Sequence, residues 1–307
     1  MSTSSLLTRP GQIPLDEEYQ KNTGITPEDI AQLRAWLDTQ PHLPAGHITD
    51  LDLILAYHCC NKSFAVAKEV LDLNLTLRTL FTNYFKNRTI EKPFPGFDSC
   101  LFTPLDIRTK SGQAVFYARL IDYDPKNFNF CSAVKAYLMV TDIWQYKEGT
   151  WPGFVFMIDL DRIVLSHLTK LDIQTMQQFL YFLQEGMLVK LQGLHFLNAP
   201  SFMDKLMMII KPFLKKELME VLHIHQIGSR SLEEFVPMAG LPKDAGGEFK
   251  TIEQCSKDII AVVNANADYF IAESNKRVVE AKRPGKPKTI SDIFGGVEGS
   301  FKKLDID

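Results

Sequence analysis

The chain has 307 residues, a formal net charge of −3 and 45% hydrophobic residues. This length is enough for one large domain with a smaller companion, and the nearly balanced charge argues against a nucleic-acid-binding surface. The start of the chain shows no secretory signal pattern, and no apolar run approaches the roughly 18 residues of a membrane-spanning helix. The five cysteines are odd in number and irregularly spaced, which indicates reduced thiols and a cytoplasmic protein.

A loose arm followed by a helical module is expected at the amino end. Residues 1–24 are polar with several glycines and prolines, as is typical of irregular chain. Thr26 before Pro27 is a typical helix start, and apolar residues then recur at helical spacing. The sequence therefore predicts a helical module over residues 25–92, and we expect Val66 on the buried face of its third helix. The three helices are expected at about 26–39, 50–60 and 63–86.

From residue 93 onwards, strands alternate with helices. Pro93, Pro95 and Gly96 mark a linker into this part. The alternation predicts an α/β domain with crossover connections over residues 93–282, and a tail over 283–307 keeps spaced apolar residues that we expect to dock on the body. The strands are expected at about 101–107, 114–121, 153–159, 191–197 and 222–226. The helices are expected at about 127–148, 172–189, 201–214 and 251–282.

One predicted strand is apolar throughout, as in a sheet covered on both faces. Because side chains alternate along a strand, Phe154, Phe156 and Ile158 should share one face, while Val155 and Met157 take the other. A close-packed core and a ligand cavity use the same residue types, so periodicity alone leaves both readings open.

The helix expected after Pro200 is apolar on two faces, with Ser201 as its predicted cap. Such a helix is either buried on both sides or meets an apolar partner on its outer side. One apolar row contains Phe202, Leu206, Ile209 and Phe213, and the other contains Met203, Met207, Ile210 and Leu214.

No pattern in the sequence indicates catalytic residues, a metal site or a cofactor. There is no Gly-x-Ser-x-Gly elbow, although His167 and several acids were weighed as members of a triad. His223 and His225 share one face of a strand, but zinc would need two further ligands at usable spacing. The glycines at 295–299 lack the Lys-Ser/Thr ending of a phosphate loop.

The segment GLHFLNAPSFMDKLMMIIKPFL, at 193–214, resembles the gate segment of the CRAL-TRIO lipid-binding family. The resemblance covers roughly residues 25–275, and it points to the tocopherol-binding members and to the many insect members. It implies a helical N-terminal module, then an α/β sandwich with a mixed or parallel sheet, an apolar ligand cavity and a gate helix. Further matching segments are Asp124-Pro125-Lys126, residues 153–160, Leu222-His223-Ile224-His225 and Leu241-Pro242 with Gly246-Gly247.

The resemblance also implies the residues of the site. Thr141 stands where a tocopherol-binding relative has serine, which keeps a hydroxyl for the polar end of a ligand. The implied ligand-binding residues are Val134, Leu138, Thr141, Phe154, Ile158, Leu171, Phe179, Phe182, Leu183, Met187, Val189, Leu191 and Leu194. The implied gate and membrane residues are Leu165, Phe202, Leu206, Ile209, Lys211, Lys215 and Lys216, with Phe202, Leu206 and Ile209 on the outer row.

The function implied is that of a cytoplasmic, monomeric, non-enzymatic carrier. It would bind one small hydrophobic lipid of tocopherol, retinoid or terpenoid type and exchange it at a transiently contacted membrane. Two alternatives stay open: a phosphoinositide-responsive adaptor in vesicle traffic, and an enzyme that acts on a bound lipid. The two basic positions that grip a phosphoinositide headgroup in a tocopherol-binding relative fall here on Glu217 and Val221, so we expect no selectivity for that headgroup.

Overall fold

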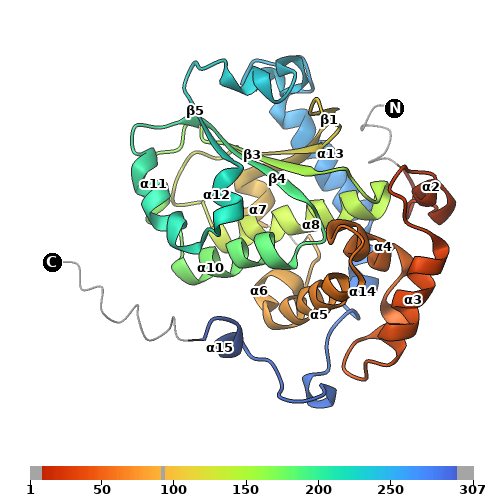
Figure 1. Cartoon of the computed structure of the whole chain (residues 1–307). Helices are drawn as coiled ribbons and strands as arrows, with labels where there is room; N and C mark the ends of the chain where they lie inside the picture. Colours follow the sequence, from red (N-terminus) through yellow and green to blue (C-terminus); the bar gives the residue numbers. More distant parts are fainter. Residues whose placement is uncertain (1–8, 91–93, 296–307) are drawn as a thin grey trace.

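The computed structural model describes residues 9–90 and 94–295, and its centre is a mixed five-stranded sheet (Figure 1). The strands lie side by side in chain order. The first pair is antiparallel and the other three pairs are parallel, so the expected α/β architecture is confirmed. The strands are β1 (Cys100–Arg108), β2 (Ala114–Leu120), β3 (Phe154–Asp159), β4 (Leu191–Ala199) and β5 (Leu222–Gln226).

Helices fill the crossovers and form the amino-terminal module. In the module they are α2 (Leu15–Tyr19), α3 (Pro27–Asp38), α4 (Asp50–Cys59), α5 (Phe64–Leu80) and α6 (Thr82–Phe85). In the α/β part they are α7 (Pro95–Ser99), α8 (Phe130–Glu148), α9 (Leu165–Leu168), α10 (Ile173–Tyr181), α11 (Met203–Ile210), α12 (Lys216–Glu220), α13 (Ile252–Ala265), α14 (Ala267–Glu273) and α15 (Ile290–Ile293). Short 3-10 turns lie at Ala45–His47, Lys211–Phe213, Ser231–Glu234, Met238–Gly240, Lys243–Ala245 and Glu280–Lys282.

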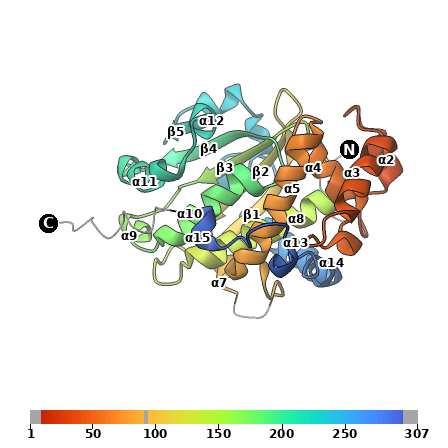
Figure 2. The same ribbon diagram turned by 60° about the horizontal axis from the view of Figure 1, so that its bottom comes forward.

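The two faces of the sheet carry separate apolar layers. Phe154 and Phe156 of β3 pack in the layer formed with α8 and α10, while Val155 and Met157 pack with residues of the 232–255 segment on the other face. This division confirms the predicted alternation along β3. Figure 2 shows that α2–α4 lie at the opposite end of the molecule from α9 and α11.

Local chemistry sets the ends of several helices. The Thr26 hydroxyl accepts from the backbone N–H of Asp29, and the Asp29 carboxylate accepts from that of Thr26, which is a complete capping box for α3. The Asn129 side chain caps α8 in the same way by accepting from Ser132. Gly149 ends α8 with a φ of 77°, a conformation that glycine adopts without strain.

Several local expectations were wrong. The arm contains α2, since Glu18 is buried and accepts hydrogen bonds from Thr150. The expected linker contains α7, which begins at Pro95. Val66 is 45% exposed, because α5 buries a neighbouring row that includes Ala67 and Leu71.

Three features of the helices also differ from the expectation. The helix expected to reach residue 189 leaves α-helical geometry after Tyr181 and ends in a π turn over Phe182–Gly186. Ser201 does not cap α11, since the residue before the first helical turn is Phe202 and no side chain caps it. The stretch expected as one helix over 251–282 breaks at Asn266 between α13 and α14.

The described part of the tail docks on the body, as expected. Phe294 stacks on Phe81 with ring centroids 6.1 Å apart and meets Tyr181 edge-on at 5.2 Å. Upstream, the Arg283 guanidinium lies 2.7 Å from the Asp72 carboxylate of α5. Residues 296–307, which belong to the same expected tail, lie outside the described residues.

Candidate functional site

An apolar pocket of about 180 Å³ lies between the helix-covered face of the sheet and the helices α8–α11. Strands β1–β4 form its floor, and side chains from α8 and α10 form its roof. Leu168 and Leu171, from and just after α9, and Leu206 and Ile210 of α11 close one side. The lining is almost entirely aliphatic and aromatic, as is typical of sites for small hydrophobic molecules.

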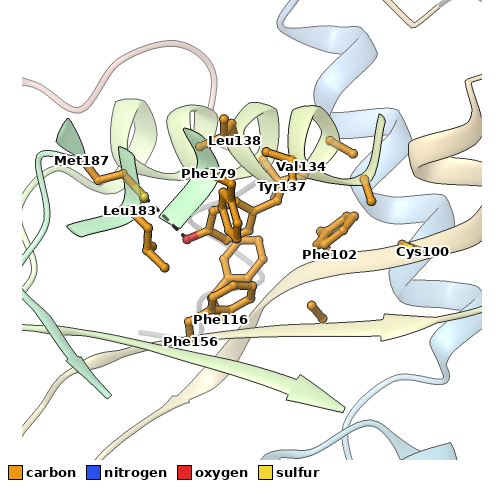
Figure 3. Close-up of a cluster of buried hydrophobic side chains, with 14 of the residues drawn as sticks. Cys100, Phe102, Phe116, Val134, Tyr137, Leu138, Phe156, Phe179, Leu183 and Met187 are labelled. Carbon is orange, nitrogen blue, oxygen red and sulfur yellow. Dashed lines mark hydrogen bonds between the residues drawn. The ribbon is translucent and has the colours of Figure 1, made fainter. Parts of the chain in front are cut away.

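Tyr137 of α8 is the central aromatic side chain of the lining (Figure 3). Its ring stacks on Phe156 at 4.5 Å and meets Phe179 edge-on at 5.5 Å. Its hydroxyl points toward the Met187 sulfur, 3.7 Å away. Because this hydroxyl already has a partner, the middle of the pocket offers a ligand an apolar surface.

The structure brings some of the implied ligand residues to the pocket and not others. The residues in the lining are Val134, Ile158, Leu171, Phe179, Leu183 and Leu194. The residues outside it are Leu138, Thr141, Phe154, Phe182, Met187, Val189 and Leu191. Thr141 is buried and its hydroxyl donates to the Tyr137 carbonyl at 2.9 Å, so it does not offer the hydroxyl expected of it.

The aromatic residues outside the lining pack elsewhere in the core. Phe154 lies with Trp151, ring centroids 5.7 Å apart, and Phe182 lies against Phe85 at 5.0 Å. Within the π turn, Leu183 lies in the pocket lining while its neighbour Phe182 packs against Phe85 of α6.

The outer row predicted for the gate helix is only partly exposed. Leu206 is 7% exposed and lines the pocket, so its assignment to the outer row was wrong for this conformation. It belongs to the buried row with Met203 and Ile210, while Phe202 and Ile209 are half-buried. The apolar side chain that α11 presents to solvent is Met208, at 73%.

The remaining implied gate residues are all accessible. Leu165 is 45% exposed, and Lys211, Lys215 and Lys216 are exposed. The Lys215 ammonium lies 2.6 Å from the Glu185 carboxylate, and that of Lys216 lies 3.8 Å from Glu220.

Three residues of the lining have polar side chains, and the implied ligand set contained none of them. They are Arg119 of β2, Asp159 of β3 and His167 of α9. The Asp159 carboxylate accepts from Tyr117, Arg119 and Asn198. Sequence spacing gave no signal for this convergence, because it arises only when β2 pairs with β3 and places Arg119 opposite Asp159.

A second cavity, of about 280 Å³, lies between α4, α5 and α14. Arg78, Asp142 and Glu273 line it, and these charges already pair with one another at 2.8–3.0 Å. It therefore suits an apolar ligand less well than the pocket under the sheet.

Histidines gather on β4 and β5, away from the pocket. His195 Nδ1 and His225 Nε2 lie 2.9 Å apart, and His225 Nδ1 lies 2.7 Å from the Ser231 hydroxyl. Over residues 9–90 and 94–295, no three histidine, cysteine or acidic side chains are placed to hold a metal ion. These side chains form a hydrogen-bonded group in which the His195 and His223 rings also stack, with centroids 4.7 Å apart.

The His195 imidazole makes a testable contribution to pH dependence. Burial, with the nearby His223 and His225, lowers the pKa of His195 to about 3, against about 6.5 in an unfolded chain. Between these values the unfolded chain holds a proton that the folded chain lacks, so lowering the pH lowers stability, by up to about 1.4 kcal/mol per unit. We expect His195→Gln to lose less stability than the wild type between about pH 7 and about pH 4 in urea titrations.

The matched control for this experiment is His47→Gln, at an exposed histidine. It should keep the wild-type slope of stability against pH. Equal slopes for all three proteins would contradict the assignment to His195.

A mixed sheet with an apolar pocket under its helical layer is typical of proteins that bind small hydrophobic molecules. Residues 99–247 match the family model described as CRAL/TRIO domain, and residues 23–94 match the model described as Pinta-like, UBA domain. The chain therefore contains a domain of the CRAL-TRIO family over residues 99–247. Members of that family typically bind and transfer lipophilic ligands and are generally not enzymes.

Relatives of known name are distant in sequence. Clavesin-1 of Pongo abelii and of Mus musculus is 26% identical over 242 residues, which are 75% of this chain and 66% of the relative. The alpha-tocopherol transfer protein-like protein of Homo sapiens is 25% identical over 224 residues, which are 73% of this chain and 60% of the relative. The chain thus matches 66% or less of the length of these relatives.

Among solved structures, a crystal structure of Sfh5 aligns with 94% of this chain and 97% of its own, at 10% identity and a TM-score of 0.43. That likeness is too slight to support a conclusion about function. Within the part of the chain that the structure describes, no helix has the length and apolar character needed to cross a membrane.

Proposed function

We propose that this protein is a monomeric, cytoplasmic carrier that binds one small hydrophobic lipid and exchanges it at membranes. The observation that supports the proposal is the apolar pocket of about 180 Å³ inside the CRAL-TRIO domain. Each methylene group moved from water into such a pocket contributes about 0.8 kcal/mol. A lipid tail therefore escapes into water slowly, and release is favoured where another apolar medium is in contact with the protein.

The size of the pocket suggests that one wall moves when a lipid enters. Sites for drug-sized ligands have volumes of roughly 300–1,000 Å³, and this pocket is smaller. Helix α11 is the candidate gate, because Leu206 and Ile210 face the pocket while Met208, on the same eight-residue helix, faces solvent. An outward shift of α11 would open the pocket next to its own exposed apolar surface.

The same region offers a surface for transient membrane contact. Met208, Val164 and Leu165 are exposed apolar side chains on segments that also contribute to the pocket wall. Lys205 and Lys211 are exposed on α11 or directly after it. Each such lysine adds about 1 kcal/mol of attraction to an anionic bilayer.

We expect Met208→Asp combined with Leu165→Asp to slow lipid transfer between vesicles about tenfold and to leave equilibrium lipid binding nearly unchanged. Two carboxylates would be repelled by anionic headgroups and would prevent insertion of this surface into the bilayer. Transfer is measured as the movement of a fluorescent lipid from donor to acceptor vesicles that contain phosphatidylserine.

The matched control is Ile271→Asp, which changes an equally apolar side chain, 61% exposed on α14, at a distance from the pocket. It should transfer lipid at the wild-type rate. Equal losses of transfer and of binding in the double variant would contradict the membrane role of this surface.

Direct identification of the cargo is the main test of the carrier function. Native mass spectrometry of the purified protein, with analysis of its organic extract, should find one lipid molecule per chain. A protein that binds none of a panel of lipids would contradict the proposal. Chemical conversion of an added lipid would favour the enzyme alternative, and a several-fold preference for phosphoinositide vesicles over phosphatidylserine vesicles of equal charge would favour the adaptor.

A further inference from the structure

Two adjacent cysteines, Cys59 and Cys60, place their sulfur atoms side by side at the end of helix α4. Cys59 is the last residue of the helix, and Cys60 follows it as the C-cap with φ −93° and ψ 23°. The two Sγ atoms lie 3.7 Å apart, and both residues are free cysteines that are only half-buried. The carrier function proposed above uses neither thiol.

The distance between the two sulfur atoms suits a bridge through a single atom. With bonds of about 2.3 Å, as between zinc and a thiolate, a tetrahedral angle at the bridging atom holds two sulfurs about 3.8 Å apart. A direct disulfide suits the pair less well, because neighbouring Cα atoms are about 3.8 Å apart and disulfides usually join Cα atoms separated by about 4.4–6.8 Å. The pair is therefore arranged for an atom that binds both sulfurs.

The surroundings of the pair favour a first thiolate on Cys60, and the thiolate is the form that bonds to such an atom. The hydrogen bond with Cys59 and the nearby Lys190 ammonium lower the pKa of Cys60, although burial acts to raise it. The same hydrogen bond and burial raise the pKa of Cys59 well above its ordinary value. Cys59 Sγ also lies 3.2 Å from the Ala56 carbonyl, a contact that needs the thiol proton and is lost when the sulfur is bridged.

The protein supplies two sulfur ligands at this site and no complete metal centre. In the part of the chain that the structure describes, no group of three histidine, cysteine or acidic side chains is placed to hold a metal ion. Structural zinc needs four ligands, so two of its positions would stay open here. Trivalent arsenic that carries one organic group needs only two sulfurs from the protein, because its third bond is already made to carbon.

We propose that Cys59 and Cys60 form a dithiol site for thiophilic compounds of the class of monosubstituted trivalent arsenicals. In the reaction with the dihydroxy form of such a compound, two As–O bonds break and two As–S bonds form, and each thiol proton leaves with one hydroxyl group as water. Arsenic stays trivalent, so the reaction needs no oxidant or reductant. The site is separate from the candidate gate, because α4 lies at the opposite end of the molecule from α9 and α11 (Figure 2).

The probe is phenylarsine oxide, and its binding to the intact protein is measured by native mass spectrometry. We expect the wild type to bind one molecule per chain. Cys59→Ser and Cys60→Ser should each bind at least about tenfold more weakly, because the second As–S bond can no longer form within the same chain. The matched control is Cys131→Ser, which removes another half-buried thiol and should bind as the wild type does.

A second measurement uses the wild type alone and separates a bridge from attachment to one thiol. Ethane-1,2-dithiol should remove the bound arsenical at concentrations at which 2-mercaptoethanol, at the same total thiol concentration, removes little, because a monothiol has to break both As–S bonds separately. Equal removal by the two reagents would overturn the inference. So would a wild type that binds no phenylarsine oxide, or serine variants of Cys59 and Cys60 that bind it as tightly as the wild type.

Discussion

Replacement of Asp142 by alanine should lower the free energy of unfolding by about 3–5 kcal/mol. Asp142 of α8 is 6% exposed, and its carboxylate accepts from Arg78 of α5 at 2.8 Å and from Arg88 at 2.7 Å. Although burial acts to raise it, the attraction of the two guanidinium groups holds the pKa of Asp142 below its ordinary range. Its removal would leave two buried cations with Glu273 as their shared carboxylate.

Urea unfolding of the variant and the wild type measures this effect. The matched control is Glu253→Ala, which removes a carboxylate from an exposed pair with Lys257 on α13 and should leave the stability close to that of the wild type. A loss below about 1 kcal/mol for Asp142→Ala would show that this ion network does not hold α5 and α14 to α8.

The pH dependence of the same carboxylate has a defined sign. Because the pKa of Asp142 is lower in the folded chain than in the unfolded chain, its contribution is fully present above the unfolded value of about 3.9. The contribution is lost only as the pH falls further, through the folded value. The stability difference between the wild type and Asp142→Ala should therefore stay constant from neutral pH down to about pH 5.

Leu183→Trp should weaken binding of a fluorescent lipid at least tenfold and change the melting temperature little. Leu183 lies in the lining of the pocket and is 2% exposed, so an indole at this position would occupy space that the ligand needs. The pocket volume of about 180 Å³ gives the larger side chain room, which limits the overpacking strain of roughly 1–3 kcal/mol that a filled core would impose.

The neighbouring residue supplies the control. Phe182 is buried against Phe85 and outside the lining, so Phe182→Leu should lower stability by about 1–2 kcal/mol and leave lipid binding intact. If Leu183→Trp binds lipid normally while its melting temperature falls sharply, Leu183 is an ordinary core residue and the pocket is not the ligand site.

Local patterns in the sequence were enough to predict most of the elements. The helix start at Thr26, the apolar strand ending at Asp159 and the strand over Leu222–Gln226 all lie where the pattern placed them. These features depend on interactions between residues that are close together in the chain. A single sequence contains all the information needed to predict them. The alternation of strands and helices in the same way predicted an α/β sheet with crossover connections.

The residues that line the pocket were harder to predict from the sequence than the helices and strands. The phase of the segment around Phe182 depends on a π turn, and that turn shifts every later side chain by part of a helical turn relative to an α-helix. The resemblance implied both Phe182 and Leu183 as ligand residues, and only Leu183 lies in the pocket lining. The two rows of α11 were equally apolar, so only the packing of Met203, Leu206 and Ile210 toward the sheet showed which row is buried.

The sequence by itself determined the α/β class, the order of the elements, the resemblance to the CRAL-TRIO family and the alternation of side chains along β3. The tertiary structure decided which apolar residues enclose empty space. The physical reason is that periodicity records which side chains avoid water, whereas a cavity depends on residues that lie far apart in the chain and meet only when the strands pair and the helices pack.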